Sequence, residues 1–270
     1  MPGMLVVFLI PFALLAAVIA GTVFSLLFYL APDQLLQALM AEETWFALRL
    51  TLSTSLISLS LALFLGIPTA YVLARYRFPG KMLLETLLDL PMVTPPLVAG
   101  VGLLFLLGRN SPLGRTLGLW NIELLFTPAG IIVAQTYVAA SIIVRSAQAT
   151  FSQQDVNYRH MALTLGLSPG WAFLLVELPM AAKGLVAAAI LGWARALGEF
   201  GASLMIAGAT RMYTETLPVA VYLNIASGET EVAVACAVIL LGLAFLLLSG
   251  TRLVHAMRSN SEARYARYPV

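Results

Sequence analysis

Long apolar runs constrain this chain more than any other feature. Six of them are long enough to cross about 30 Å of hydrocarbon at about 1.5 Å of rise per residue. Inside a bilayer every backbone polar group needs a partner from the same segment, and a helix provides one. The sequence therefore predicts six membrane-spanning helices, at residues 4–30, 45–75, 82–107, 126–151, 180–207 and 232–257.

The composition supports a membrane protein built only of helices. Hydrophobic residues make up 60% of the 270 residues and charged residues 10%, and the mean hydropathy is +0.93. Soluble proteins are about 45–50% apolar and about 25% charged. No linker or internal repeat divides the chain. We predict an all-α polytopic membrane protein with one domain over residues 1–270, core helices within about 45–257 and a cytoplasmic tail at 258–270.

The distribution of basic residues predicts how the chain crosses the membrane. Cytoplasmic loops of membrane proteins are enriched in Lys and Arg. Only four basic residues fall on the side predicted to be external: Arg49, Arg109, Arg115 and Arg211. The richer side is predicted to be cytoplasmic and to hold both termini; its basic residues are Arg75, Arg77, Lys81, Arg145, Arg159, Lys183, Arg252, Arg258, Arg264 and Arg267.

Prolines mark two irregular points. Pro79 and Gly80 follow basic residues and predict a tight cytoplasmic hairpin at 75–81. Pro95 and Pro96 lie inside a predicted span, where prolines remove helix hydrogen bonds. Broken helices of this kind lie inside a bundle or against a cavity. We predict Pro95 and Pro96 as pathway or gate residues, with a kink for packing alone as the alternative.

A polar segment at 152–179 separates two apolar runs. Residues 155–164 can form a short amphipathic helix that Gly166 ends, and the turn at 168–170 leads back toward the next span, whose entry we place at Pro179. A helix held at both ends by spans suits the groove of a partner. The alternative is an interfacial helix lying on lipid.

Within this segment the sequence resembles a known family. Gly166, Val176, Leu178 and Pro179 match the second half of the loop motif of type I importer permeases of ABC transporters. The first half departs, because His160-Met161-Ala162 stands where the family usually has Glu-Ala-Ala. The resemblance implies a coupling helix that docks on an ATPase subunit. The implied docking residues are Asp155, Tyr158, Arg159, His160, Met161, Ala162, Gly166, Leu178 and Pro179.

Further strings resemble the molybdate/tungstate branch of that family. The most discriminating is Gly198-Glu199-Phe200-Gly201, within 194–201. Sulfate permeases carry a related string, so sulfate or thiosulfate remains the alternative substrate. The other matching strings are AYVLAR at 70–75, FPGK at 78–81, DLPMVTPP at 89–96, VAG at 98–100 and LGRNSPLG at 107–114.

The resemblance also implies partners and a location. It implies a second copy of the chain, two ATP-binding cassette ATPase subunits and an external substrate-binding protein, in the lipid of the cytoplasmic (inner) membrane. The chain contains no GxxxxGK[ST] phosphate loop, so ATP would act in the ATPase subunit and the permease itself would not be an enzyme. We predict no catalytic residue, no metal site, no cofactor and no nucleic-acid partner.

Two charged residues in the fifth predicted span complete the candidate pathway. Arg195 and Glu199 stand one helical turn apart, and a charge at membrane depth costs on the order of 2.5–3.5 kcal/mol on insertion scales. They therefore either pair as a structural contact or line the pathway, with Arg195 attracting an anion and Glu199 weakening its hold. Phe200 belongs to the same candidate set. The external segment 208–231 is predicted as a short helix or re-entrant piece, or else a plain loop.

Two other functional classes compete with this interpretation. An ion-coupled secondary transporter would also use broken helices and charges at the membrane midplane. A membrane enzyme would need a catalytic constellation, and the two histidines, His160 and His255, are not spaced to build one.

Overall fold

The computed structural model describes the backbone of residues 2–265 and the side chains of residues 7–250 and of Arg252. Residues 266–270, the end of the predicted tail, lie outside the described part. The described chain contains helices and no strand. The helices are α1 (Pro2–Leu27), α2 (Pro32–Met40), α3 (Glu42–Arg75), α4 (Lys81–Val93), α5 (Pro96–Leu107), α6 (Pro112–Leu119), α7 (Pro128–Ser152), α8 (Val156–Thr164), α9 (Pro169–Ala172), the π-helix η1 (Phe173–Glu177), α10 (Leu178–Leu197), α11 (Gly201–Ala207), α12 (Leu217–Ser227) and α13 (Thr230–Tyr265).

The predicted number of spans is confirmed when one bent pair is counted as a single span. Within the described residues five helical stretches are long and apolar enough to cross a membrane: Val7–Leu27, Glu42–Arg75, Pro128–Ser152, Pro169–Leu197 and Thr230–Gly250. The sixth span is α4 with α5, whose axes differ by 117°. The all-α polytopic fold class is thereby confirmed.

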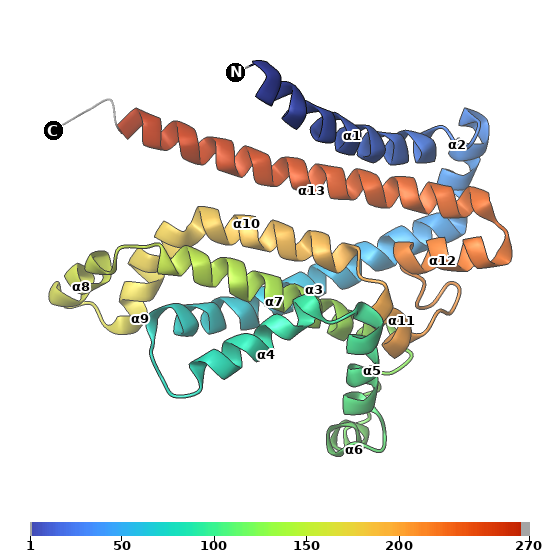
Figure 1. Ribbon diagram of the computed structural model, residues 1–270. Coiled ribbons are helices and arrows are strands. Elements are labelled where there is room, and N and C mark those ends of the chain that lie inside the picture. The colour runs from blue at the N-terminus through green and yellow to red at the C-terminus, as the bar shows by residue number, and fades with distance from the viewer. Residues whose placement is uncertain (1, 266–270) are drawn as a thin grey trace.

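The bend between α4 and α5 corrects the single helix predicted at 82–107. Thr94 and Pro95 have extended backbones, each with ψ of 132°, and α5 begins with Pro96. Because neither proline has an N–H, the helical hydrogen-bond ladder cannot run through them. The chain turns here, and α5 points away from the main bundle toward α6 (Figure 1).

The fifth predicted span, 180–207, is also wrong in its bounds. The helix begins earlier, at Pro169, and ends at Leu197, so the segment beyond forms the separate α11. The last helix continues past the predicted end at residue 257 as far as Tyr265, which includes part of the predicted tail.

The bundle is centred on α3, α7 and α10, which lie side by side (Figure 1). Glycines allow this close packing. A Cβ atom added to Gly192 would lie 2.6 Å from Cγ1 of Ile143, and one added to Gly184 would lie within 2.5 Å of the Thr150 side chain. Both neighbours are on α7, so small residues on α10 set how closely the two helices approach.

The two ends of the bundle carry different elements. The end of α13 lies toward the same end as the loop with α8 and α9, and α1 runs from that direction to α2 at the opposite end, where α12 also lies (Figure 1). The hairpin predicted at 75–81 is confirmed at the α8 end: α3 stops at Arg75, Gly80 has φ of +81°, and α4 starts at Lys81. The helix α1 touches little of the bundle, and none of its most apolar window is buried.

Candidate functional site

The short helix predicted in the polar segment is present as α8. The Asp155 carboxylate accepts a hydrogen bond from the Asn157 N–H at 2.9 Å, which caps the first turn. At the other end Gly166 has φ of +91°, and the N–H groups of Gly166 and Leu167 donate to the carbonyls of Leu163 and Ala162. This is a Schellman motif, which requires a left-handed residue. Local sequence signals therefore fix both ends of the helix.

One side of α8 packs inward and the other faces outward. Ala162 is buried, with 4% of its surface exposed, and Arg159 is half-buried. Tyr158, Met161 and Leu165 are 48%, 54% and 84% exposed, and His160 is exposed as well. The outer side thus presents apolar side chains that the described chain leaves uncovered.

The second half of the loop differs from the sequence prediction. Pro179 does not mark the entry to the next span, because α9, η1 and α10 form continuous helix from Pro169 onward. The widened π-turn carries a hydrogen bond from the Leu178 N–H to the Phe173 carbonyl. Pro179 follows this π-turn at the second position of α10, so it lies inside the continuous helix and removes one helical hydrogen bond there.

The sequence reasoning missed the most buried charge of this region, Glu177. Its side chain is 2% exposed, and Oε1 accepts from Nε of Arg75 at 2.9 Å. Its Oε2 accepts from the Tyr71 hydroxyl at 2.6 Å and lies 3.8 Å from Nε of Arg159. An acidic residue inside an apolar run was the available signal, since such a residue rarely faces lipid.

Gln154, just after α7, joins the same cluster from a third direction. Its Nε2 donates to the backbone carbonyl of Glu177 at 3.0 Å, and its Oε1 accepts from Nη2 of Arg75 at 3.2 Å. We call Tyr71, Arg75, Gln154, Arg159 and Glu177 the inner cluster. It ties α3, the end of α7, α8 and η1 together at one end of the bundle.

The predicted pathway residues lie where two helix breaks meet. The break between α4 and α5 contains Pro95 and Pro96, and the break between α10 and α11 contains Glu199 and Phe200. A Cβ atom added to Gly201 would lie 2.8 Å from Cβ of Pro96, so glycine allows this contact. The structure therefore brings the two parts of the candidate pathway together.

Arg195 and Glu199 form an ion pair, with 2.6 Å between Nη1 and Oε2, although they do not share one continuous helix. Glu199 follows the end of α10, and its Oε1 accepts from the Ala202 N–H at 2.9 Å in the first turn of α11. The Glu199 side chain is fully buried and that of Arg195 is 31% exposed. Glu199 thus fixes the break, and the Phe200 ring lies 5.5 Å from the Tyr222 ring on α12.

A second charged pair also escaped the sequence reasoning. Nη2 of Arg145 on α7 lies 3.0 Å from Oδ2 of Asp89 on α4, and their side chains are 53% and 31% exposed. One turn away, Nε2 of Gln148 donates to Glu85 at 2.7 Å. These contacts hold the first half of the bent span against α7.

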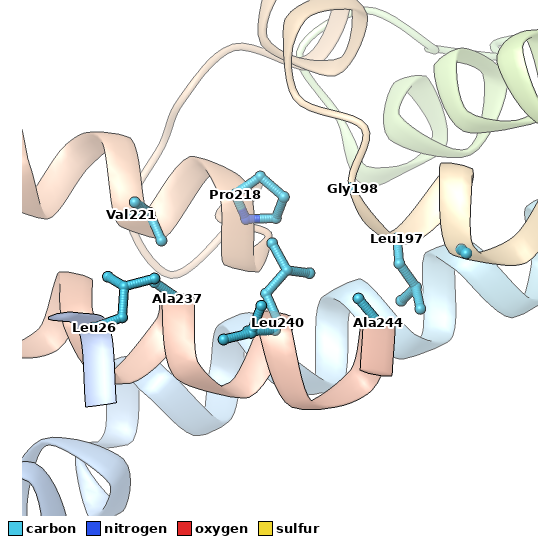
Figure 2. Close-up of a pocket in the computed structure, with 10 residues that line it drawn as sticks. Leu26, Leu197, Gly198, Pro218, Val221, Ala237, Leu240 and Ala244 are labelled. Carbon is cyan, nitrogen blue, oxygen red and sulfur yellow. The ribbon is translucent and has the colours of Figure 1, made fainter. Parts of the chain in front are cut away.

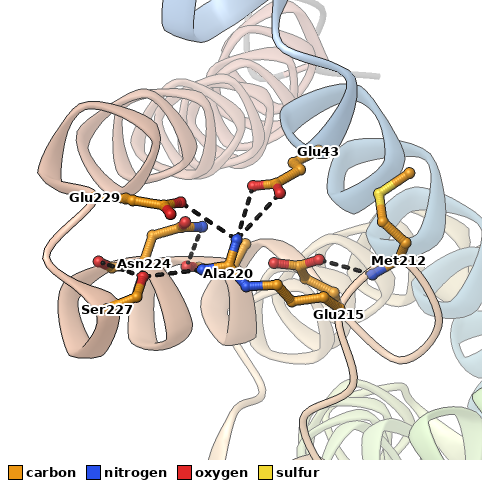
Figure 3. A network of polar contacts seen from close by, with 8 residues as sticks. Glu43, Met212, Glu215, Ala220, Asn224, Ser227 and Glu229 are labelled. Carbon is orange, nitrogen blue, oxygen red and sulfur yellow. Dashed lines mark hydrogen bonds and ion pairs between the residues drawn. The ribbon is translucent and has the colours of Figure 1, made fainter.

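The opposite end of the bundle has its own polar network (Figure 3). Nη1 of Arg211 lies 3.1 Å from Glu43 and 3.3 Å from Glu229, and Nη2 donates to Ser227 at 2.9 Å. Glu215 is buried beside it and accepts from the Met212 N–H at 2.9 Å. We call Glu43, Arg211, Glu215, Ser227 and Glu229 the outer cluster. The short helix predicted in this segment is present as α12.

An apolar pocket of about 470 Å³ opens between α1, α10, α12 and α13 (Figure 2). Its lining includes Leu26, Leu197, Pro218 and Leu240, and it contains no charged side chain. A pocket of this composition gives an anion neither a cation nor a hydrogen-bond donor. In the described part of the chain, no group of three or more His, Cys, Asp or Glu residues is placed to hold a metal ion.

Comparison with a family model decides what kind of protein carries this geometry. Residues 62–258 match the family described as the inner membrane component of binding-protein-dependent transport systems. The chain belongs to this family of ABC importer permeases. It is a multi-pass inner-membrane protein, and the resemblance found in its loop motif and in its Gly-Glu-Phe-Gly string is confirmed.

Individual relatives agree with this assignment. The chain is 38% identical over 204 residues to the molybdenum transport system permease protein ModB of Mycobacterium tuberculosis, covering 76% of this chain and 77% of the relative. It is 34% identical over 229 residues to the sulfate transport system permease protein CysW of Synechocystis sp., covering 85% and 83%. The bacterial alginate ABC transporter has the same fold, with a TM-score of 0.72, 15% identity and coverage of 94% and 93%.

Proposed function

We propose that this permease forms the pathway for a divalent tetrahedral oxyanion, with molybdate or tungstate as the substrate and sulfate or thiosulfate as the alternative. The names of the relatives support this class, because molybdenum and sulfate permeases both match over most of the chain. The 38% identity to the molybdenum permease of Mycobacterium tuberculosis supports molybdate, and sulfate permeases at 34–36% identity keep sulfate as the alternative. Arg195, held beside Glu199, offers an anion a weak attraction at the helix breaks.

The chain also lacks a phosphate loop, so ATP would be hydrolysed by two separate ATPase subunits. The geometry of α8 is the observation that supports docking of a separate ATPase subunit. Both of its ends are capped, adjoining helices hold it, and it exposes Tyr158, Met161 and Leu165. An apolar helix face of this size fits a groove in a partner.

A second copy of the chain would complete the pathway. The exposed α1 supports this, since large apolar side chains along it, such as Phe12 and Phe24, are 68% and 58% exposed. Lipid covers part of such a surface, and the remainder is available to the partner copy. A substrate-binding protein would dock at the end that carries α12 and the outer cluster.

The proposed orientation has both termini and α8 in the cytoplasm. Basic residues support it, because Arg75, Arg77 and Lys81 lie in the hairpin at the α8 end. The end of α13 lies toward that same end, and α1 runs from that direction toward the opposite end (Figure 1). Labelling single introduced cysteines from outside the cell would test the orientation.

The docking role is tested with Met161→Pro, which interrupts α8. We expect detergent-solubilised Met161→Pro to lose the ATPase subunit in a pull-down, because proline removes a helix hydrogen bond and costs roughly 3 kcal/mol or more. Met161→Leu keeps helix and volume and is the matched control. Retention of the ATPase by the proline variant at the control level would contradict the docking assignment.

The substrate and the energy source are tested in proteoliposomes. Uptake of molybdate, tungstate and sulfate is measured with the binding protein outside and with or without the ATPase and ATP inside. We expect ATP-dependent uptake, strongest for molybdate or tungstate. Uptake driven by an ion gradient without the ATPase would instead indicate a secondary transporter.

A further inference from the structure

We propose that Glu177 is a positioning residue for coupling: its buried contacts transmit displacement of α8 to α3 and α10. This inference rests on the proposed docking of α8 to an ATPase. It assigns a role to the inner cluster, which the loop motif does not specify.

Contacts from several segments of the chain converge on Glu177. Glu177 ends η1, directly before α10, and binds Arg75 and Tyr71 near the end of α3. Its backbone carbonyl accepts from Gln154, which follows α7. Arg159 approaches the same carboxylate from the middle of α8. One residue therefore contacts the docking helix and segments adjoining all three central helices.

The contact between Arg75 and Glu177 is rigid. The Arg75 and Glu177 side chains are 5% and 2% exposed, so solvent screens their attraction little. Tyr71, which donates to Glu177, is itself packed among aromatic rings. Its ring centroid lies 4.5 Å from that of Phe173 and 5.4 Å from that of Phe151. Close-packed interiors pass on displacement because they have few voids to absorb it. A movement of η1 must therefore move α3 as well.

Arg159 reaches the inner cluster from α8. Its Nε lies 3.8 Å from Glu177 Oε2, beyond the roughly 2.7–3.2 Å of a direct hydrogen bond. Its guanidinium lies 5.8 Å from the Tyr76 ring centroid, near the end of α3. A shift of α8 by about 1 Å would close the Arg159 contact, so the carboxylate responds to the position of the docking helix.

Glu177 also belongs to the π-helix η1. Its Leu178 N–H bonds the Phe173 carbonyl, a wider spacing than in an α-helix. Single π-turns occur frequently at functional sites and rotate the residues that follow them. Here the π-helix ends at Glu177 and connects α9 to α10.

Docking and transmission involve different side chains, so they can be separated. Tyr158, Met161 and Leu165 are exposed, whereas Glu177 is buried. A substitution at Glu177 therefore leaves the outward surface of α8 chemically unchanged. Loss of transmission should appear as ATP hydrolysis that no longer drives uptake.

The test uses Glu177→Gln in the complete transporter reconstituted with its ATPase and binding protein. We expect normal ATPase pull-down and an increase of at least tenfold in ATP hydrolysed per anion imported. The matched control is Glu85→Gln, which removes a carboxylate that is 25% exposed and lies on α4. It should keep the wild-type ratio of hydrolysis to uptake.

If the Glu177→Gln protein does not accumulate in cells, a second variant tests the same proposal. Tyr71→Phe removes only the 2.6 Å hydrogen bond and keeps the ring and the ion pair. It should raise the same ratio by a smaller factor, about threefold, because the ion pair between Arg75 and Glu177 stays in place and only one hydrogen bond is lost.

The outcomes separate the two proposals. An unchanged ratio in Glu177→Gln, or in Tyr71→Phe where the first variant does not accumulate, would overturn this inference. A loss of uptake matched by an equal loss of docked ATPase would also overturn it, since that result indicates a structural role. Wild-type protein that binds no ATPase would instead refute the proposed function.

Discussion

The inner and outer clusters use the same chemistry in different surroundings. In each, an arginine pairs with a glutamate from a distant segment of the chain: Arg75 with Glu177, and Arg211 with Glu43. The inner pair, Arg75 and Glu177, is 5% and 2% exposed, whereas Arg211 and Glu43 in the outer cluster are 36% and 33% exposed. A buried charge that loses its partner stays both unpaired and unsolvated, at a large cost in free energy, whereas water can replace the partner of an exposed charge.

This difference indicates two mechanical roles. The inner cluster holds its elements together through a movement, which suits the end that would receive force from the ATPase. The outer cluster joins the start of α3 to both ends of α12 through contacts that water can replace. Such contacts suit an end that opens and closes during transport.

The largest expected effect comes from Arg75→Met. It removes the cation and leaves the Glu177 carboxylate buried, and breaking a buried pair in this way costs about 3–5 kcal/mol. We expect a marked fall in the thermal unfolding midpoint of the purified protein in detergent. The double variant Arg75→Met/Glu177→Met removes both charges and should recover much of the loss. If Arg75→Met alone is as stable as wild type, the inner pair contributes no more to stability than the pair of Arg211 and Glu43 in the outer cluster.

A smaller effect is expected from Glu215, in the loop between α11 and α12 and outside the spans. Burial raises the pKa of its carboxyl above the usual 4.5; the Met212 N–H opposes this rise, and the nearby Glu43 adds to it. The folded state then holds its proton more tightly than the unfolded state. The contribution of Glu215 to stability is therefore greatest at low pH and is lost as pH rises from about 4.5 through the raised pKa.

Glu215→Gln tests this pH dependence, because the amide imitates the protonated carboxyl. The unfolding midpoint of wild type is measured between pH 4.5 and pH 8 and compared with that of the variant. We expect the difference between them to shift in favour of the variant as pH rises. Parallel curves would show that Glu215 does not titrate with a raised pKa.

The comparison also shows what the sequence could predict. Local signals sufficed where a structure is made by adjacent residues: Asp155 and Gly166 predicted the ends of α8, and Pro95 with Pro96 predicted an irregular span. The break after Leu197 was missed because it contains no proline. Two contacts stabilise this break. The Glu199 carboxylate accepts a hydrogen bond from the Ala202 N–H, and Gly201 packs against Pro96, about a hundred positions away in the chain.

Distant partners also explain why the inner cluster was missed. The partners of Glu177 on α3 are more than a hundred positions away, at Tyr71 and Arg75. No short spacing encodes such a pair. The isolated acid in an apolar run showed that a partner was needed, but only the packing of α3 against α7 and α10 identifies it.

The smallest expected effect is that of Arg211→Gln, and its salt dependence sharpens the comparison. The Arg211 contacts to Glu43 and Glu229 are partly exposed, and pairs of this kind contribute little to stability. At 1 M salt the Debye length is about 3 Å, so little of their attraction remains. We expect a slightly lower unfolding midpoint at low salt and no difference from wild type at 1 M. The loss caused by Arg75→Met should persist at both salt concentrations, because solvent ions do not reach the inner pair. An Arg211→Gln effect that is equally independent of salt would mean that the outer cluster is as firmly closed as the inner one.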